Sequence, residues 1–346
     1  QIIVAFKSPY TDAQISEHLK IYNASVIKKI DGINQTVVKV PEGQESTIEQ
    51  KLKTDPYVEG VQRDYTTHAL FVPNDEGFAQ QYGLNNTGQR ILGKAGTANA
   101  DIHVTKAWDV TRGDGIKVAV LDTGVNLNHP DLAGKVTGQK SFISSTVEDG
   151  NGHGTHVAGI IAADTNNNIG VAGTCPSCTL LIGKIIDDSG EGTTSNAVAG
   201  ITWAADQGAK VINLSVGTTE LQTASLYNQA AQYAIQKGAL IVAAVGNNNE
   251  TNLIYPAAAT RVLSVGATDN TDKKASWSNY GANWVDIAAP GEDILSTGPM
   301  HSFDKQPSGY SASLPYFFLS GTSMAGPEVA GVAALIAATE YGKTPI

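Results

Sequence analysis

The chain of 346 residues has little cysteine, few charged side chains and no long apolar run. Charged residues make up 16% of it, and acidic residues outnumber basic ones, so the formal net charge is −10. Nucleic-acid phosphates bind basic surfaces, and because this chain is acidic we expect no nucleic-acid partner. A membrane-spanning helix needs roughly 18 or more consecutive apolar residues, so the sequence predicts no membrane span.

The only two cysteines form the motif Cys175-Pro176-Ser177-Cys178. A pair at this spacing can be a redox pair, half of a zinc site or a disulfide that closes a small loop. Zinc is disfavoured because no second cysteine or histidine pair has suitable spacing, and the surrounding pattern is not thioredoxin-like. We favour a local disulfide between Cys175 and Cys178, which an oxidising extracellular environment would form.

Apolar runs and helical patterns alternate through the larger part of the chain, which is also rich in glycine. The strand-like runs are residues 117–121, 179–185, 210–214, 239–244 and 262–265, and the helical patterns are residues 153–163, 194–205, 224–237 and 326–338. Continuously apolar strands separated by helices predict an α/β fold, in which a parallel sheet is covered on both faces to give three layers. Ligands of such sheets bind at the carboxyl ends of the strands.

Residues 1–70 show a different pattern and are predicted to form a separate small domain. Strands are expected at residues 1–7, 26–33, 37–40 and 58–65, and helices at residues 13–24 and 46–54. This βαββαβ order predicts a ferredoxin-like α+β sandwich. The fold by itself implies no function.

Residues 321–327 (GTSMAGP) bring a serine to the start of an apolar helix. Pro327 is tolerated in the first helical turn, so we expect Ser323 at the helix N-terminus. Free backbone N–H groups and the positive end of the helix dipole stabilise negative charge there, which suits a nucleophile whose attack creates an oxyanion. The motif alone is equally compatible with an ordinary serine cap.

A serine nucleophile needs a base, and the base needs an orienting partner. Residues 118–124 (VAVLDTG) predict a buried strand that ends on Asp122, and residues 153–159 (HGTHVAG) place His153 at a helix start. The chain order Asp122, His153, Ser323 is one of the known orders of the Ser-His-Asp triad. His156 is the competing base.

These three motifs, in this order, resemble those of the subtilisin-like serine proteases, and weaker similarity extends over nearly the whole chain. The resemblance implies a secreted, monomeric endopeptidase that acts on protein and peptide substrates through an acyl-enzyme. It favours His153 over His156 as the base. It also makes Asn247 a donor to the oxyanion, although asparagine after glycine is common in turns.

The same resemblance makes residues 1–70 an inhibitory and chaperone propeptide and residues 71–346 the peptidase domain. It implies that the chain cleaves itself after Leu70, which leaves Phe71 as the new N-terminus. The propeptide would then act as an intramolecular inhibitor. The alternative is a latent or non-catalytic peptide-binding protein that retains its N-terminal domain.

The resemblance implies that an extended substrate adds a strand to the active-site edge. The matching positions are Gly190, Glu191 and Gly192 on one side and Ser215, Val216 and Gly217 on the other, with Ile254 as the floor of the main specificity pocket. Glu191 favours basic substrate side chains, whereas Ile254 and the cleavage point favour apolar residues before the scissile bond. Without the triad, each stretch reads as an ordinary turn.

The family also binds structural Ca²⁺, which takes about six to eight oxygen ligands. The matching ligands are the carboxylates of Asp75 and Asp131, the side-chain oxygen of Asn167, and the carbonyls of Asp164, Ile169 and Val171. The alternative for residues 164–171 is a solvated turn. A second calcium loop, which the family resemblance would place just before His153, is not expected. Residues 141–149 are shorter than that loop and keep only two acidic residues.

Three departures from the family pattern stand near the serine motif. Gly326 and Glu328 replace other residue types, and we expect changes in packing or pH response from them rather than loss of activity. Residues 302–318 are an apparent insertion. The sequence leaves open whether this insertion shapes the leaving-group side of the cleft or forms a surface loop.

Overall fold

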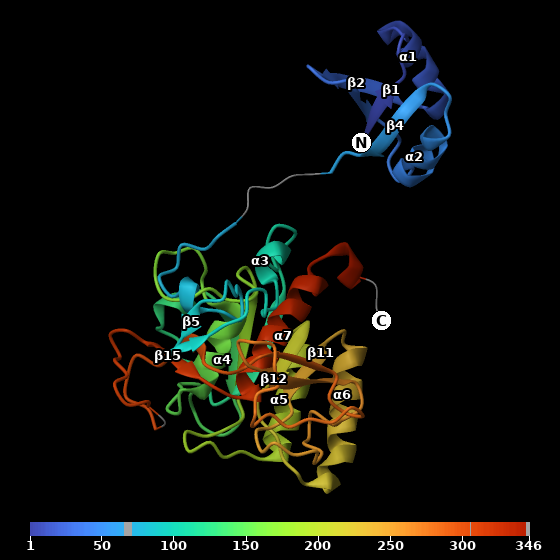
Figure 1. The fold of residues 1–346 in the computed structure, drawn as a ribbon. Coiled ribbons are helices and arrows are strands. Elements are labelled where there is room, and N and C mark those ends of the chain that lie inside the picture. The colour runs from blue at the N-terminus through green and yellow to red at the C-terminus, as the bar shows by residue number, and fades with distance from the viewer. Residues whose placement is uncertain (66–70, 305, 344–346) are drawn as a thin grey trace. The chain divides into compact units, whose positions relative to one another are not determined.

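The computed structural model describes residues 1–65, 71–304 and 306–343 (Figure 1). The chain divides into two compact units, Gln1–Ala69 and Leu70–Ile346. In the described part of the chain, no helix combines the length and the apolar character that crossing a membrane requires.

The first unit is a four-stranded antiparallel sheet with two helices. Its elements are β1 (Ile2–Phe6), α1 (Asp12–Leu19), β2 (Ser25–Ile30), β3 (Gln35–Lys39), α2 (Glu45–Lys53) and β4 (Val58–Arg63). The sheet order is β2-β3-β1-β4, and Ile2, Leu19 and Leu52 are fully buried in its core. The predicted βαββαβ order is confirmed. Helix α1 is shorter than predicted, because the chain tightens into a 3₁₀ turn at Lys20–Tyr22 and then turns at Asn23, whose φ is 50°.

The second unit is built on a seven-stranded parallel sheet of order β13-β12-β11-β10-β7-β9-β8. The strands are β7 (Lys117–Asp122), β8 (Val136–Ser141), β9 (Thr179–Lys184), β10 (Val211–Leu214), β11 (Leu240–Ala244), β12 (Val262–Thr268) and β13 (Ile287–Pro290). The five predicted strands are β7, β9, β10, β11 and β12. The edge strands β8 and β13 escaped prediction because an edge strand need not be apolar on both faces.

Helices cover both faces of this sheet (Figure 1). They are α4 (His153–Ala162) and α7 (Thr322–Ala337) on one face, and α5 (Thr194–Asp206) and α6 (Ala224–Gln236) on the other. Side chains of β7 alternate between the two layers: Val118 and Val120 pack with α4 and α7, whereas Ala119 and Leu121 pack with α5 and α6. This three-layer α/β arrangement confirms the predicted fold class.

Short elements complete the second unit. The strand pairs are β5 (Arg90–Ile91) with β6 (Lys94–Ala95), and β14 (Ile294–Thr297) with β15 (Tyr316–Leu319), both antiparallel. A short helix α3 (Val104–Ala107) and 3₁₀ turns at Phe78–Gln80, Pro130–Leu132, Leu221–Thr223 and Glu340–Lys343 lie between the larger elements. Residues 298–315 connect the two strands of the β14–β15 hairpin and hold most of the insertion.

Candidate active site

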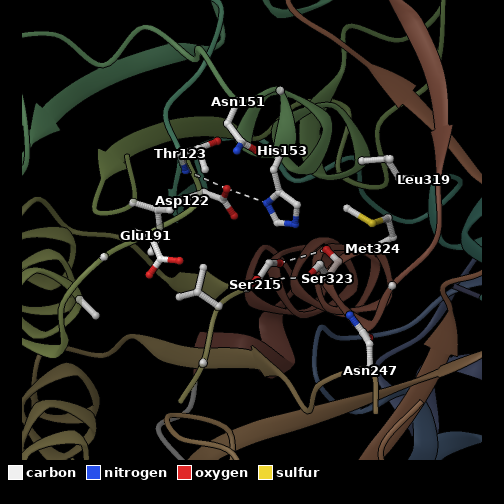
Figure 2. A pocket seen from close by; sticks show the side chains of 18 of the residues that line it. Asp122, Thr123, Asn151, His153, Glu191, Ser215, Asn247, Leu319, Ser323 and Met324 are labelled. Carbon is white, nitrogen blue, oxygen red and sulfur yellow. Dashed lines mark hydrogen bonds and ion pairs between the residues drawn. The ribbon is translucent and has the colours of Figure 1, made fainter. Parts of the chain in front are cut away.

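Asp122 and His153 meet at the carboxyl end of the parallel sheet. Asp122 ends β7 and is fully buried, whereas His153 begins α4. The Nδ1 atom of His153 lies 2.7 Å from Oδ1 of Asp122, and this oxygen also accepts the backbone N–H of Thr123 at 2.8 Å. A carboxylate so close keeps the proton on Nδ1, which leaves Nε2 able to act as a base. In Figure 2 the imidazole lies between Asp122 and Ser323.

His156, the competing base, lies one turn further along α4 and is fully buried. Its Nε2 lies 3.0 Å from the carbonyl oxygen of Phe317, and burial lowers the pKa of His156 to about 3. The ring therefore stays neutral inside the protein. Of the two histidines, His153 is the one that contacts Asp122.

The buried carboxylate of Asp149 holds the start of α4 against the end of β7. Its oxygens accept the backbone N–H groups of Gly152 and Thr155, both at 2.8 Å, and the hydroxyls of Thr155 at 2.6 Å and Thr123 at 2.8 Å. The first N–H groups of a helix lack partners within the helix, so this carboxylate supplies them. The sequence analysis did not assign this role. An acid shortly before a helix start is the signal that indicates it.

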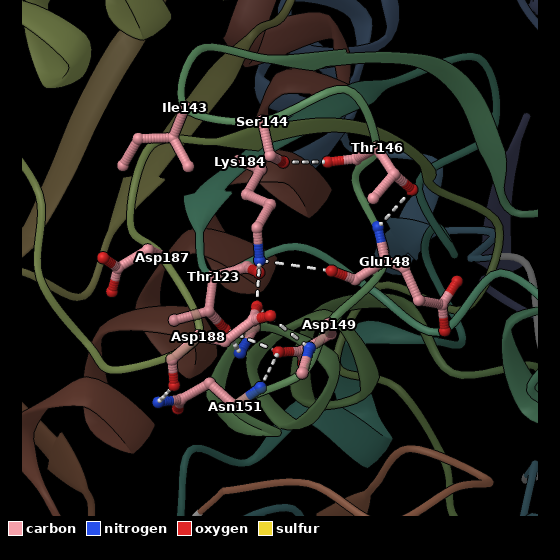
Figure 3. Close-up of polar contacts among 12 residues, drawn as sticks. Thr123, Ile143, Ser144, Thr146, Glu148, Asp149, Asn151, Lys184, Asp187 and Asp188 are labelled. Carbon is pink, nitrogen blue, oxygen red and sulfur yellow. Dashed lines mark hydrogen bonds and ion pairs between the residues drawn. The ribbon is translucent and has the colours of Figure 1, made fainter.

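Lys184 joins the same region from β9 (Figure 3), where it pairs with Asp122 in the sheet register. Its ammonium donates to the carbonyl oxygen of Thr123, to the carbonyl of Glu148 at 3.1 Å and to Oδ1 of Asp188 at 2.6 Å. The Lys184 side chain is 3% exposed and that of Asp188 is 60% exposed. One buried cation thus ties together the segment that follows Asp122 and the segment that precedes His153. Sequence reasoning missed it, although a lysine within an apolar strand is a usable signal.

Helix α7 begins at Thr322, so Ser323 lies in its first turn. Pro327 is the sixth helical residue, which makes the expectation that it lies in the first turn wrong. A proline there leaves the carbonyl of Ser323 without its usual helical donor. The hydroxyl of Ser215 replaces that donor at 3.0 Å, while the hydroxyl of Ser323 donates to the carbonyl of Ser215 at 3.1 Å. Pro327 is therefore accommodated because Ser215, the residue that follows β10, donates to the carbonyl that the proline leaves without a partner.

Asn247 follows β11 and is oriented by Thr322. Its Oδ1 accepts both the backbone N–H and the hydroxyl of Thr322, each at 2.9 Å. These two bonds fix the amide, and Figure 2 shows its nitrogen turned toward Ser323. The Asn247 amide and the helix N-terminus therefore direct N–H groups at the space beside the serine hydroxyl, the arrangement that stabilises an oxyanion.

One cavity of about 520 Å³ brings these groups together. It is lined by Asp122, His153, Asn247 and Ser323, and also by Gly190, Glu191, Gly192, Ser215, Val216 and Gly217. All four predicted catalytic residues and six of the seven predicted substrate-binding residues thus share one cleft. The arrangement supplies a nucleophile, a base with its orienting carboxylate, and donors for a developing negative charge.

The sequence of the chain matches the profiles of two known families. The sequence profile of the subtilase family matches residues 113–345. The chain belongs to the subtilase family. The profile of the fervidolysin N-terminal prodomain matches residues 1–62 of this subtilase. The predicted family is confirmed for both parts of the chain.

Named relatives of this subtilase are proteinases. The thermophilic serine proteinase of Bacillus sp. (strain AK1) is 39% identical over 341 residues, which are 97% of this chain and 77% of the relative. Thermitase of Thermoactinomyces vulgaris is 46% identical over 270 residues, or 77% of this chain and 86% of thermitase. A solved protease of Pseudoalteromonas arctica PAMC 21717 superposes with a TM-score of 0.67 at 31% identity, covering 79% of this chain and 89% of that one. This subtilase is a subtilisin-like serine protease with a prodomain.

Ile254, predicted as a pocket floor, is not among the residues that line the cleft. It is buried beneath Gly217, where a Cβ atom added to the glycine would come within 2.4 Å of Cγ2 of Ile254. Ile254 therefore supports the backbone of one substrate-binding segment from behind. Glu191 does line the cleft, and Figure 2 shows its carboxylate beside it.

The predicted calcium ligands lie around the loop of residues 164–171. Asp75 and Asp131 are both buried. Asp75 accepts the N–H of Asn166 at 2.9 Å, and Asp131 accepts the N–H of Val171 at 2.9 Å and the Asn167 amide at 2.8 Å. Burial raises the pKa of Asp131 to about 6, and the negative charge of Asp75 adds to the rise. Two buried acids without a cation repel each other, so this environment favours bound positive charge.

The predicted calcium ligands are two carboxylates, one amide oxygen and three backbone carbonyls, so most of them are uncharged. Among the described residues, no group of three or more His, Cys, Asp or Glu side chains gathers as a metal site. The carbonyls of Asp164, Ile169 and Val171 accept no hydrogen bond within the described part of the chain. The amide nitrogen of Asn167 donates to Asp131 at 2.8 Å and its oxygen accepts the N–H of Ile169 at 3.0 Å, so in this structure the nitrogen and not the oxygen faces the Asp131 carboxylate.

The remaining predicted positions are scattered over the second unit. Cys175 and Cys178 are bonded to each other and buried. Leu70 lies outside the described residues. The ring of Phe71 packs edge-on against Trp108 at 5.7 Å between ring centroids, and the guanidinium of Arg112 lies 3.9 Å from its centre.

Glu328, one of the departures from the family pattern, is a buried acid on α7. It lies against Gly83, where an added Cβ atom would come within 2.1 Å of its Oε1. Burial raises the pKa of Glu328 well above its ordinary value, and the charge of Asp101 acts in the same direction. Its carboxyl is therefore stabilised in the neutral form.

Proposed function

We propose that this subtilase is a secreted, monomeric endopeptidase that hydrolyses peptide bonds with Asp122, His153 and Ser323 as its catalytic triad. The observation that carries the proposal is the 2.7 Å contact between His153 Nδ1 and Asp122 Oδ1 in the cleft that Ser323 also lines. That contact sets the tautomer in which Nε2 of His153 can take a proton from serine.

In the proposed reaction, the hydroxyl of Ser323 donates its proton to Nε2 of His153 and attacks the carbonyl carbon of the peptide. The resulting oxyanion accepts the Asn247 amide and the backbone N–H of Ser323. His153 then protonates the leaving amine, and water hydrolyses the acyl-enzyme by the same steps. Asp122 stays ionised and stabilises the imidazolium of His153.

The substrate is proposed to lie extended between residues 190–192 and residues 215–217. Both segments line the cleft and contain glycine, which allows a peptide backbone to approach closely. Glu191 supplies negative charge at one side, so basic residues upstream of the cleaved bond are favoured.

We further propose that residues 1–70 are an inhibitory propeptide and that the chain cleaves itself after Leu70. The prodomain match to residues 1–62 and the separate compactness of Gln1–Ala69 support this assignment. The packing of Phe71 against Trp108 gives the new N-terminus a fixed starting point.

Structural Ca²⁺ is proposed to bind between Asp75, Asp131 and the loop of residues 164–171. The buried carboxylates and the unused carbonyls of the loop fit an oxygen-binding cation. The ion would supply the positive charge that the two carboxylates lack, and it would anchor the segment that follows the new N-terminus.

The deciding experiment compares the intact mass and N-terminal sequence of the wild type with those of Ser323→Ala after incubation with calcium. We expect the wild type alone to lose residues 1–70. If both proteins remain full length, the protein is latent or only binds peptides. If both are trimmed, another protease made the cut, and a peptide-hydrolysis assay of the wild type then decides whether it is an enzyme.

A further inference from the structure

The insertion, residues 302–318, forms most of the connection between β14 and β15 and the start of β15; most of its described residues are exposed, but several of its aromatic side chains pack together. Rings of Phe303, Tyr310 and Phe317 contact one another at 5.0–5.7 Å between centroids. Phe303 is 8% exposed and Phe317 is 7% exposed. The hydroxyl of Tyr310 donates to the carbonyl of Pro299 at 2.5 Å. This aromatic cluster gives the segment a fixed shape.

The same segment is attached to the residues that precede the catalytic histidine. The N–H of Asp304 donates to the carbonyl of Gly150 at 2.9 Å, and Nε2 of His301 lies 3.0 Å from Oε1 of Glu148. The ring of Phe303 packs on Gly152, where an added Cβ atom would come within 2.5 Å of its Cε2. The insertion therefore reaches the residue next to His153.

Phe303 and Phe317 of the insertion, together with Leu319, the residue that follows it, line the active-site cleft. Figure 2 shows Glu191 and Ser215 on one side of the line from His153 to Ser323, and Leu319 and Met324 on the other. The proposed acyl part of the substrate occupies the side of Glu191. The side of Leu319 is thus where the amine half of the substrate leaves.

We propose that Phe303, Phe317 and Leu319 form a subsite for the first residue after the scissile bond, and that it takes an apolar side chain of small or medium size. The inference rests on the proposed peptidase function. Phe303 and Phe317 are buried aromatic side chains in the wall of the cleft, and such a bulky wall disfavours a large substrate side chain there. A charged side chain would lose water without gaining a partner among these apolar groups.

The test uses the full chain after self-processing and a series of peptides that differ only at the first residue after the cleaved bond: glycine, alanine, leucine, phenylalanine or glutamate. A methyl ester with the same acyl part serves as a substrate without that residue. For Phe303→Ala, we expect the kcat/KM ratio of the phenylalanine peptide to the alanine peptide to rise about tenfold. Hydrolysis of the methyl ester reports any general effect of the substitution on the catalytic groups, and the peptide rates are compared with it.

Leu314→Ala is the matched control, because Leu314 lies on the same segment but is 70% exposed and does not line the cleft. Its selectivity should equal that of the wild type. Unchanged selectivity in Phe303→Ala, or an equal loss on ester and peptides, would overturn the subsite. If Phe303→Ala does not fold, Phe303→Leu is judged by the same ratios. A wild type that cleaves no substrate would instead refute the proposed function.

Discussion

The orientation of the Asn247 amide makes a sharp prediction about catalysis. Both hydrogen bonds to its Oδ1 come from Thr322, so the amide nitrogen alone can face the cleft. Substituting Asn247 by alanine removes one of the two proposed oxyanion donors and leaves the triad in place. Loss of such a donor typically lowers kcat by about 10²–10³, or about 2.7–4 kcal/mol of transition-state stabilisation.

Thr322→Val gives an intermediate case. It removes the hydroxyl donor to Asn247 but keeps the backbone N–H, so the amide loses one of its two anchors. A neutral hydrogen bond contributes about 1 kcal/mol, which corresponds to a decrease in kcat of about fivefold. The same hydroxyl accepts the N–H of Gly246 at 3.1 Å, so unfolding free energy should also fall by about 1–3 kcal/mol.

The assay is steady-state hydrolysis of one peptide at concentrations that span KM, with each variant's processing verified by mass. We expect kcat to fall in the order wild type, Thr322→Val, Asn247→Ala, with KM changed by less than about threefold. The oxyanion donor stabilises the transition state and not the bound substrate, so its loss should leave KM alone. A large rise in KM at constant kcat would show that Asn247 only binds substrate, and the reasoning would fail.

Three further predictions concern stability. Lys184→Met should cost about 2–4 kcal/mol in urea unfolding because the carbonyls of Thr123 and Glu148 lose a buried donor, whereas Asp188→Asn, which keeps that donor, should cost under about 1 kcal/mol. Calcium at 100 times its Kd should stabilise the wild type by about 2.7 kcal/mol, and this gain should vanish in Asp131→Asn but persist in Asp164→Asn, which retains its carbonyl; an equal gain in all three would refute the site. Because burial raises the pKa of Glu328, the native state binds the extra proton and loses stability as pH rises above about 4.5. The Tm of Glu328→Gln should therefore exceed that of the wild type by a margin that grows with pH, and a constant margin would contradict this.

The elements that sequence reasoning found share a physical property. Strands β7, β9, β10, β11 and β12 lie inside the sheet and are apolar on both faces, so their runs are visible without the structure. Strand β8 lies at the edge, and five of its six residues are polar or glycine, so its pattern resembles a loop. The β14–β15 hairpin encloses the insertion, which separates its strands in the sequence.

In the candidate site, too, some residues could be predicted from local sequence and others could not. Asp122, His153 and Ser323 stand in short motifs at the ends of strands or the starts of helices, and local sequence is enough to propose them. Lys184 and Asp149 act through buried contacts with several segments; their local sequence marks them as unusual residues but does not say which segments they contact. Ile254 is apolar, as a pocket floor requires, but its position beneath Gly217 is a matter of packing.

What the sequence by itself determined is the family and the layered fold, and it also supplied the candidates for the reacting groups, because these depend on short motifs, apolar periodicity and side chains at element ends. Only the tertiary structure decided how groups far apart in the chain meet. It brings Asp122 to His153 across 31 positions, and it lets Ser215 satisfy the carbonyl that Pro327 leaves open 108 positions away. Such contacts depend on how whole elements pack, and packing is a property of the folded chain.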